Sequence, residues 1–277
     1  MTILICTSEF APSAKVGGLA DAVAVLAKGL VQRSHTVRVV LPRYRAFDET
    51  RVSRTVGEIH VPVGRSTERC TLRANTVDGV EVILVENDRL YGDREGIYGP
   101  SPAEAYGDNL VRFHVLSWTA AALATSGPFQ ADILHAHDWP TALSVVYANT
   151  GNGADHSAAP IGDTETAVVA HAKIHRRADD RTIGTVFSIH NLAFQGDVPP
   201  RELAAVSNLP ENELQRTGLI GERGANLVRG AVNVADRIVT VSPTYATEIR
   251  QPKYGRGLHR ELQQRGANVI GILNGID

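Results

Sequence analysis

Short apolar runs alternate with segments of helical period along most of this chain of 277 residues. Ile3–Cys6 is the first such run, and the apolar positions of Asp21–Gln32 recur with the spacing of one helix face. Strands that alternate with helices are joined by crossovers, which connect parallel strands. The pattern therefore predicts an α/β fold with a parallel sheet flanked by helices. The other strands that we expect are Thr36–Leu41, Ile133–His135, Thr185–Ile189, Arg237–Val241 and Val269–Leu273. The other expected helices are Ala103–Ala124, Pro140–Asn149, Glu222–Ala235, Thr244–Arg250 and His259–Gln264.

Residues 58–86 depart from this alternation. Glu58–Val63, Arg69–Thr76 and Val80–Val85 have the composition of strands, without a helical segment between them. Asp78-Gly79 is typical of a two-residue hairpin turn. This region therefore predicts a small antiparallel β insertion beside the parallel sheet.

Residues 150–181 are rich in glycine, aspartate and asparagine, and we expect them to form a flexible surface insertion. Three histidines lie in this segment, His156, His171 and His175. Their spacing matches no compact metal site, so we predict a solvated loop and no bound metal.

Charge and cysteine content limit the partners and the compartment. The net charge of −2 lacks the basic excess of proteins that bind nucleic acid or anionic membranes. Cys6 and Cys70 lie far apart in the sequence and predict reduced thiols. The start of the chain reads directly as a strand, and no apolar run reaches the roughly 18 residues of a membrane span. We therefore expect a cytoplasmic protein without a nucleic-acid or membrane partner.

Lys15-Val16-Gly17-Gly18-Leu19 lies where the first strand gives way to the first helix. The N-terminus of a helix attracts anions, glycines let a ligand approach the backbone, and lysine supplies a charge for phosphate. The motif is neither the dinucleotide fingerprint nor the P-loop. A glycine turn that packs the helix closely on the strand explains the same residues, so the motif alone leaves both interpretations open.

Three further polar stretches follow expected strands, where α/β proteins bind their ligands. They are His135-Ala136-His137-Asp138-Trp139, His190-Asn191-Leu192-Ala193-Phe194-Gln195-Gly196 and Val241-Ser242-Pro243-Thr244-Tyr245. Local explanations exist for each: a His-x-His-Asp stretch often forms local hydrogen bonds, and Ser242-Pro243 is a good helix start.

Together and in this order, the motifs resemble those of the glycogen and starch synthases, glycosyltransferase family 5. The loop Tyr91–Tyr98, the stretch Asp108–Phe113 and the final Leu273–Asp277 also match in order. The resemblance covers essentially the whole chain outside residues 150–181. It implies a Rossmann-like domain that is one half of a GT-B fold, with residues 1–277 as the N-terminal catalytic domain.

The resemblance also implies roles for single residues. Lys15 would contact the phosphate of a nucleotide sugar, and Gly17 and Gly18 would offer backbone N–H groups to the same region.

Four further residues would lie around the transferred sugar. His190 is implied to be the active-site histidine, and Asp138 a catalytic carboxylate near the acceptor or sugar pocket. Tyr91 would be an aromatic platform for a glucosyl ring, and Asn191 a further substrate-binding residue.

The function implied is glucosyl transfer from ADP-glucose, or another nucleotide-glucose, to the non-reducing end of an α-1,4-glucan. The family retains anomeric configuration and needs no metal or cofactor. Asn274–Asp277 match the interdomain linker, so the C-terminal nucleotide-binding domain is expected to be absent from this chain and carried by a separate chain, if at all. We therefore expect little catalysis by this chain alone, and self-association through its apolar interdomain face.

Two alternatives remain open: a glucan or sugar-nucleotide binding module without turnover, and an inactive truncated remnant. A dinucleotide-binding Rossmann enzyme is disfavoured because the first turn lacks the three-glycine spacing.

Overall fold

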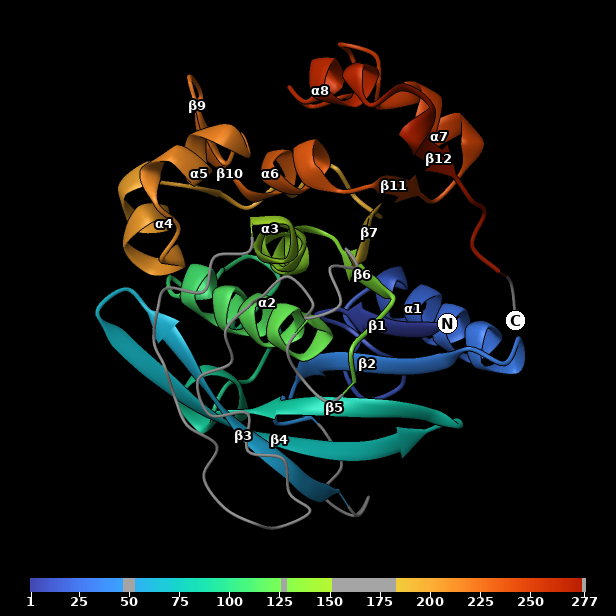
Figure 1. The fold of residues 1–277 in the computed structure, drawn as a ribbon, viewed down its shortest axis with the longest axis vertical. Coiled ribbons are helices and arrows are strands. Elements are labelled where there is room, and N and C mark those ends of the chain that lie inside the picture. Colours follow the sequence, from blue (N-terminus) through green and yellow to red (C-terminus); the bar gives the residue numbers. More distant parts are fainter. Residues whose placement is uncertain (47–52, 126–128, 151–182, 276–277) are drawn as a thin grey trace.

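The computed structural model describes residues 1–46, 53–125, 129–150 and 183–275. Nine strands among these residues form one sheet, in the order β12-β11-β7-β6-β1-β2-β5-β4-β3 (Figure 1). Their bounds are Thr2–Cys6 (β1), Thr36–Pro42 (β2), Arg54–Val63 (β3), Ser66–Val77 (β4), Val80–Glu86 (β5), Ile133–His137 (β6), Gly184–Ile189 (β7), Arg237–Thr240 (β11) and Val269–Gly271 (β12). The strands from β12 to β5 are parallel, which confirms the α/β class.

Strand β1 is the point at which the chain changes direction across the sheet. It pairs with β2 on one side, Ile3 opposite Val37, and with β6 on the other, Ile3 opposite Ile133. The crossover from β1 to β2 and the crossover from β5 to β6 therefore run in opposite directions. The loops after β1 and β6 diverge, and such a switch point leaves a crevice at the carboxyl edge of the sheet.

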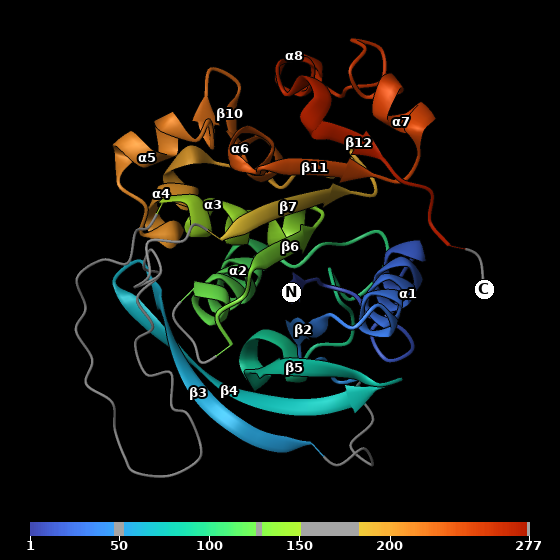
Figure 2. The ribbon, with the colours of Figure 1, turned by 45° about the vertical axis from the view of Figure 1, so that its right-hand side comes forward.

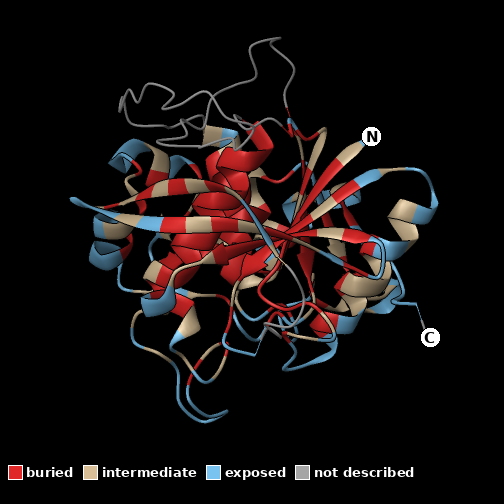
Figure 3. Ribbon diagram, turned by 90° about the horizontal axis from the view of Figure 1, so that it is seen from below, coloured by how far each residue is buried: buried red, intermediate tan, exposed pale blue. Residues whose placement is uncertain are grey.

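Helices cover the sheet on opposite faces. Right-handed crossovers that run in opposite directions place their helices on opposite faces, so α1 (Gly18–Gln32) lies apart from α2 (Asn109–Thr125) and α3 (Ala142–Thr150) (Figures 1 and 2). Helix α2 is buried along almost its whole length, from Leu110 to Thr125 (Figure 3). It packs against both the sheet and α3, which makes it the centre of the core.

The antiparallel strands belong to the main sheet instead of decorating it. Strands β3, β4 and β5 pair antiparallel as predicted, and Asp78 and Gly79 turn the last hairpin with positive φ angles of 49° and 82°. However, β5 also pairs in parallel with β2, with Val39 opposite Val82. The region extends the sheet because β5 is apolar enough to be buried inside it.

Two expected helix starts are wrong. The helix expected from Ala103 begins at Asn109, because the N–H of Tyr106 donates to the carbonyl oxygen of Tyr98 at 2.9 Å and Asp108 pairs with Arg94, which holds the segment before Asn109 as a loop. The helix expected from Glu222 is α6 (Leu227–Val234), which begins after a short strand and is capped by Asn226.

The remaining elements are short, and several were not predicted. They are α4 (Pro200–Ser207), α5 (Glu211–Arg216), α7 (Pro243–Glu248), α8 (His259–Gln264), the 3₁₀ turns Trp139–Thr141 and Gly266–Asn268, and a π-helical turn Asp88–Gly92. A second sheet of the described residues contains β8 (Asp197–Val198), β10 (Gly224–Asn226) and β9 (Ile220–Gly221). The expected insertion, with His156, His171 and His175, lies outside the described residues apart from Thr150. None of the helices in the described part of the chain is long and apolar enough to cross a membrane.

Candidate active site

The loops that follow β1, β6 and β7 meet at the carboxyl edge of the sheet, beside the N-terminal half of α1. A cavity of about 170 Å³ opens there. Its walls are residues of α1, the ends of β6, β7 and β11, and the tail after β12. The lining includes Ala22, Val25, His135, His137, Ser188, His190, Thr240 and Leu273. The structure thus brings together all three polar stretches that followed strands in the sequence, because Val241 also lines the cavity and the hydroxyl of Tyr245 accepts the N–H of Leu192 at 3.1 Å.

Three histidines form a continuous cluster along one side of this cavity. Nδ1 of His137 lies 3.0 Å from Nε2 of His190, and Nε2 of His135 lies 2.7 Å from Oγ of Ser188. The rings of His135 and His137 stack with centroids 4.2 Å apart. Burial lowers the pKa of His190 to about 4 and that of His135 to about 3. The cluster is therefore neutral near pH 7 and can donate or accept hydrogen bonds without adding charge.

Asp138 joins β6 to the loop after β7. Its Oδ1 accepts the backbone N–H of His190 at 2.8 Å and that of Asn191 at 3.4 Å. Burial raises the pKa of Asp138 to about 7, although these two hydrogen bonds oppose the rise. Its backbone has a φ of 57° and a ψ of 180°, a conformation that residues other than glycine adopt at a cost of about 1–3 kcal/mol. Such strain is concentrated at functional sites, which supports a functional role for Asp138.

The Lys15 loop follows β1 at the same carboxyl edge of the sheet, although Lys15, Gly17 and Gly18 are not among the residues that line the cavity. Lys15 is half exposed, and its Nζ lies 2.7 Å from Oδ2 of Asp21. Gly17 and Gly18 are exposed, and an added Cβ at either would meet no atom of the described chain within 4 Å. Neither has a positive φ. Close packing therefore does not explain these glycines, and the open space beside them is available to a ligand.

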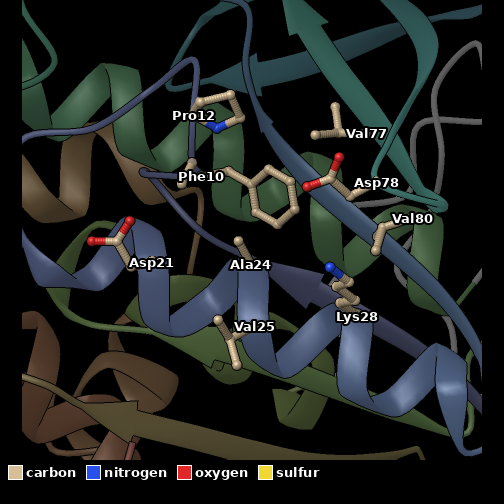
Figure 4. A pocket seen from close by; sticks show the side chains of 10 residues that line it. Phe10, Pro12, Asp21, Ala24, Val25, Lys28, Val77, Asp78 and Val80 are labelled. Carbon is tan, nitrogen blue, oxygen red and sulfur yellow. The ribbon is translucent and has the colours of Figure 1, made fainter. Parts of the chain in front are cut away.

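A second pocket, of about 230 Å³, lies on the other side of α1 (Figure 4). It is bounded by the loop from Phe10 to Pro12, by α1, and by the β4–β5 turn. Asp21 lines this pocket and also pairs with Lys15, so the ion pair stands beside this second pocket.

Glu9 is the residue of this edge that the sequence did not reveal. Its side chain is 4% exposed, and Oε2 accepts the backbone N–H groups of Val16 at 2.8 Å and Gly17 at 2.9 Å. The N–H that we expected Gly17 to offer to phosphate is therefore donated to Glu9 in this structure. The signal available in the sequence was an acidic residue three positions after a buried strand and directly before the apolar Phe10.

The expected aromatic platform is wrong at Tyr91. Its side chain is fully buried, and its hydroxyl donates to the carbonyl oxygen of Arg112 at 2.6 Å. A ring without an exposed face cannot stack on a sugar. It lies in the π-helical turn Asp88–Gly92, which folds back on the core shortly after β5, and its ring packs edge-on against the buried Tyr44.

Asn191 is exposed next to His190, and its Oδ1 accepts the backbone N–H of Ala193 at 3.0 Å, but it is not among the residues that line the cavity. Within the residues that the structure describes, no group of three histidine, cysteine, aspartate or glutamate side chains is arranged to hold a metal ion. Cys6 and Cys70 are both buried and free, in line with the expected reduced thiols.

A family model described as the starch synthase catalytic domain matches residues 2–161 and 161–264. This chain belongs to that family. Among curated relatives, glycogen synthase 2 of Geobacter metallireducens is 37% identical and the glycogen synthase of Myxococcus xanthus is 34% identical, each over 280 residues. Both alignments cover 100% of this chain but only 52% and 54% of the relatives, so the chain spans about half the length of the curated relatives it matches.

A solved structure agrees with this assignment. The catalytic domain of starch synthase IV from Arabidopsis thaliana, bound to ADP and acarbose, superposes with a TM-score of 0.78 at 29% identity. The match covers 100% of this chain and 52% of that one. The resemblance inferred from the motifs is confirmed, as is the fold class of one half of a GT-B fold.

Proposed function

We propose that this chain is the acceptor-side half of a glucosyltransferase that extends an α-1,4-glucan. The donor is ADP-glucose, the acceptor is the non-reducing end of the glucan, and the anomeric configuration is retained. The observation that carries the proposal is that Lys15, Asp138 and His190 follow the neighbouring parallel strands β1, β6 and β7 at one edge of the sheet, with Asp138 bound to the backbone of His190, in a member of the starch synthase family. The ADP and acarbose bound by the Arabidopsis relative support a nucleotide and a glucan-like sugar as the two ligand types.

The residues suggest different roles around the reacting carbon of the transferred glucose. Lys15 and the first-turn N–H groups of α1 face the leaving diphosphate, whose negative charge grows as the glycosidic bond breaks. His190 is neutral, so it can hydrogen-bond a sugar hydroxyl without repelling the positive charge that develops on the sugar ring. Asp138, with a pKa of about 7, holds the backbone of His190 and offers a carboxylate near that charge.

The other half of the relatives' length is proposed to form the second wall of the cleft, as a C-terminal nucleotide-binding domain on the same or a separate polypeptide. One wall supplies only part of the charge that stabilises the transition state. We therefore expect this chain to bind ADP-glucose weakly and to transfer glucose slowly when assayed alone.

Replacing Lys15 tests the phosphate contact. We expect Lys15→Ala to weaken ADP-glucose binding by about tenfold, since a charged contact to phosphate contributes roughly 1.4 kcal/mol. Stability should change by less than about 1 kcal/mol because the ion pair with Asp21 is exposed. Isothermal titration calorimetry measures the first effect and thermal unfolding the second.

Lys28→Ala is the matched control, since Lys28 is an exposed lysine of α1 that lines the other pocket. Equal affinity in wild type, Lys15→Ala and Lys28→Ala would remove Lys15 from the donor site.

Non-catalytic binding is the second candidate, favoured by the half-length match to the relatives. Transfer of labelled glucose to glycogen separates the two. Incorporation by this chain, alone or with the C-terminal half of a relative, supports the transferase. Binding of ADP-glucose or glucan without incorporation in either case supports the binding module.

A further inference from the structure

Glu9 is buried at the base of the Lys15 loop, and uncharged groups donate the hydrogen bonds that its carboxylate accepts. Oε2 accepts the N–H groups of Val16 and Gly17, and Oε1 accepts the hydroxyl of Tyr98 at 2.7 Å. A buried carboxylate is costly to leave unpaired, so these three bonds strongly favour one loop conformation.

Tyr98 extends the network to a second loop. Its hydroxyl also lies 2.9 Å from Oγ of Ser8, and its carbonyl oxygen accepts the side-chain amide of Asn109 at 2.7 Å. Burial, and next the charge of Glu9, raise the pKa of Tyr98 well above its ordinary value, so the hydroxyl keeps its proton and donates it to Glu9.

The same ring connects to the third loop of the site. The centroid of Tyr98 lies 6.3 Å from that of Trp139, the residue after Asp138, and both rings pack on Phe113 of α2. Glu9 and Tyr98 thus link the loop that carries Lys15 to the loop that carries Asp138 across the switch point of the sheet.

We propose that Glu9 is a positioning residue for the nucleotide sugar: its buried carboxylate holds the backbone of Val16 and Gly17, and thereby aims Lys15 and the start of α1 at the ligand. The inference rests on the proposed function. Because Gly17 has no side chain to cap α1, the first-turn N–H groups of the helix remain available to an anion once Glu9 has taken the two amides before them.

Two substitutions at Glu9 separate the effect of its hydrogen bonds from the effect of its charge. In Glu9→Gln, the amide oxygen accepts the N–H groups of Val16 and Gly17, while the NH₂ donates to the Tyr98 hydroxyl, which in turn donates to Ser8. Every bond is kept and only the charge is lost. Glu9→Ala removes the three acceptor contacts together, so it frees the loop.

Two measurements on this chain test the proposal. Amide hydrogen exchange at Val16 and Gly17, followed by NMR, reports the order of the loop without any ligand. Titration with ADP-glucose reports its consequence. We expect Glu9→Ala to speed exchange at these amides and to weaken binding by about tenfold each, and Glu9→Gln to stay within about threefold of wild type.

The outcomes separate cleanly. Wild-type affinity in Glu9→Ala overturns the inference while leaving the proposed function intact. Equal loss of binding in Glu9→Gln and Glu9→Ala, with slow exchange in both, overturns positioning in favour of a charge effect. Absence of ADP-glucose binding by the wild type overturns the proposed function and this inference with it.

Leu4 and Ile5 of β1 serve as reference amides for the intact fold. Rapid exchange of these two amides in Glu9→Ala would mean that the variant unfolds. In that case Tyr98→Phe tests the proposal, since it removes one hydrogen bond to Glu9 and keeps the ring. A loss of binding of about threefold supports the link. Unchanged binding and unchanged exchange at Val16 and Gly17 overturn it.

Discussion

At the scale of single residues, the site holds an acid and a base side by side, and burial favours the neutral form of each. Burial raises the pKa of Asp138 to about 7 and lowers that of His190 to about 4, although Asp138 binds the backbone N–H of His190. Close to neutral pH, the carboxyl therefore titrates beside an imidazole that is already uncharged. Small changes in the surroundings of Asp138 will decide how much negative charge faces the sugar.

The raised pKa of Asp138 predicts a pH-dependent effect on stability. The folded carboxyl binds a proton more tightly than the unfolded one, so the stability it contributes is present below about pH 4 and is lost as the pH rises to about 7. The amide introduced by Asp138→Asn cannot titrate but keeps an oxygen for the N–H of His190. The free energy of unfolding of this variant relative to wild type should therefore rise between pH 4 and 7, on the order of 2 kcal/mol, and stay level above pH 7.

Urea unfolding of both proteins at pH 5, 6, 7 and 8 measures this difference. The buried histidines are present in both, so their own titration cancels. A difference that is constant over this range would contradict the raised pKa.

At the scale of elements, helix α1 carries two glycines with different surroundings. Gly18 is its first residue and faces open space, whereas a Cβ at Gly29 would touch only the guanidinium of Arg33, at 3.7 Å. Both positions therefore accept alanine without a clash. Only Gly18 lies at the edge that we propose for the nucleotide sugar.

Alanine at Gly18 should separate stability from binding. We expect Gly18→Ala to leave the free energy of unfolding unchanged or to raise it by up to about 1 kcal/mol, because alanine favours the helix. The added methyl group should weaken ADP-glucose binding by about tenfold, through lost approach to the backbone. Calorimetry and thermal unfolding provide the two values. Gly29→Ala is the control, and equal binding by the two variants would mean that the ligand does not approach Gly18.

At the scale of the whole molecule, several large apolar side chains are exposed on the loops at the carboxyl edge of the main sheet. Val16 is 64% exposed, Phe194 63%, Ile272 57% and Leu273 72%. They lie in the Lys15 loop, the loop after β7 and the tail after β12 (Figure 2). Exposed apolar residues on neighbouring loops mark a surface that associates with another.

This surface predicts self-association of the chain. The weight-average mass from light scattering should rise with concentration, and the double variant Ile272→Gln, Leu273→Gln should reduce the rise by removing apolar area from the contact. A single mass equal to that of the monomer, 29.8 kDa, over the whole concentration series would contradict the prediction.

Local patterns were enough wherever one segment specifies its own structure. The apolar run Ile3–Cys6, the period of Asp21–Gln32 and the turn Asp78-Gly79 each predicted the element that the structure contains. The helix start expected at Ala103 was wrong because contacts with an earlier segment determine the structure there. Tyr106 and Asp108 bind Tyr98 and Arg94, which lie eight and fourteen positions earlier, and the helical period of residues 103–108 gave no sign of these contacts.

The sequence by itself determined the fold class, the family and the loops that carry Lys15, Asp138 and His190, because periodicity and ordered motifs are properties of neighbouring residues. Only the tertiary structure decided that Tyr91 is buried and that β5 pairs with β2. It alone brought Glu9 beneath the Lys15 loop and Tyr98 beside it. Burial and hydrogen bonding join residues that are far apart along the chain, and these contacts exist only once the sheet has formed.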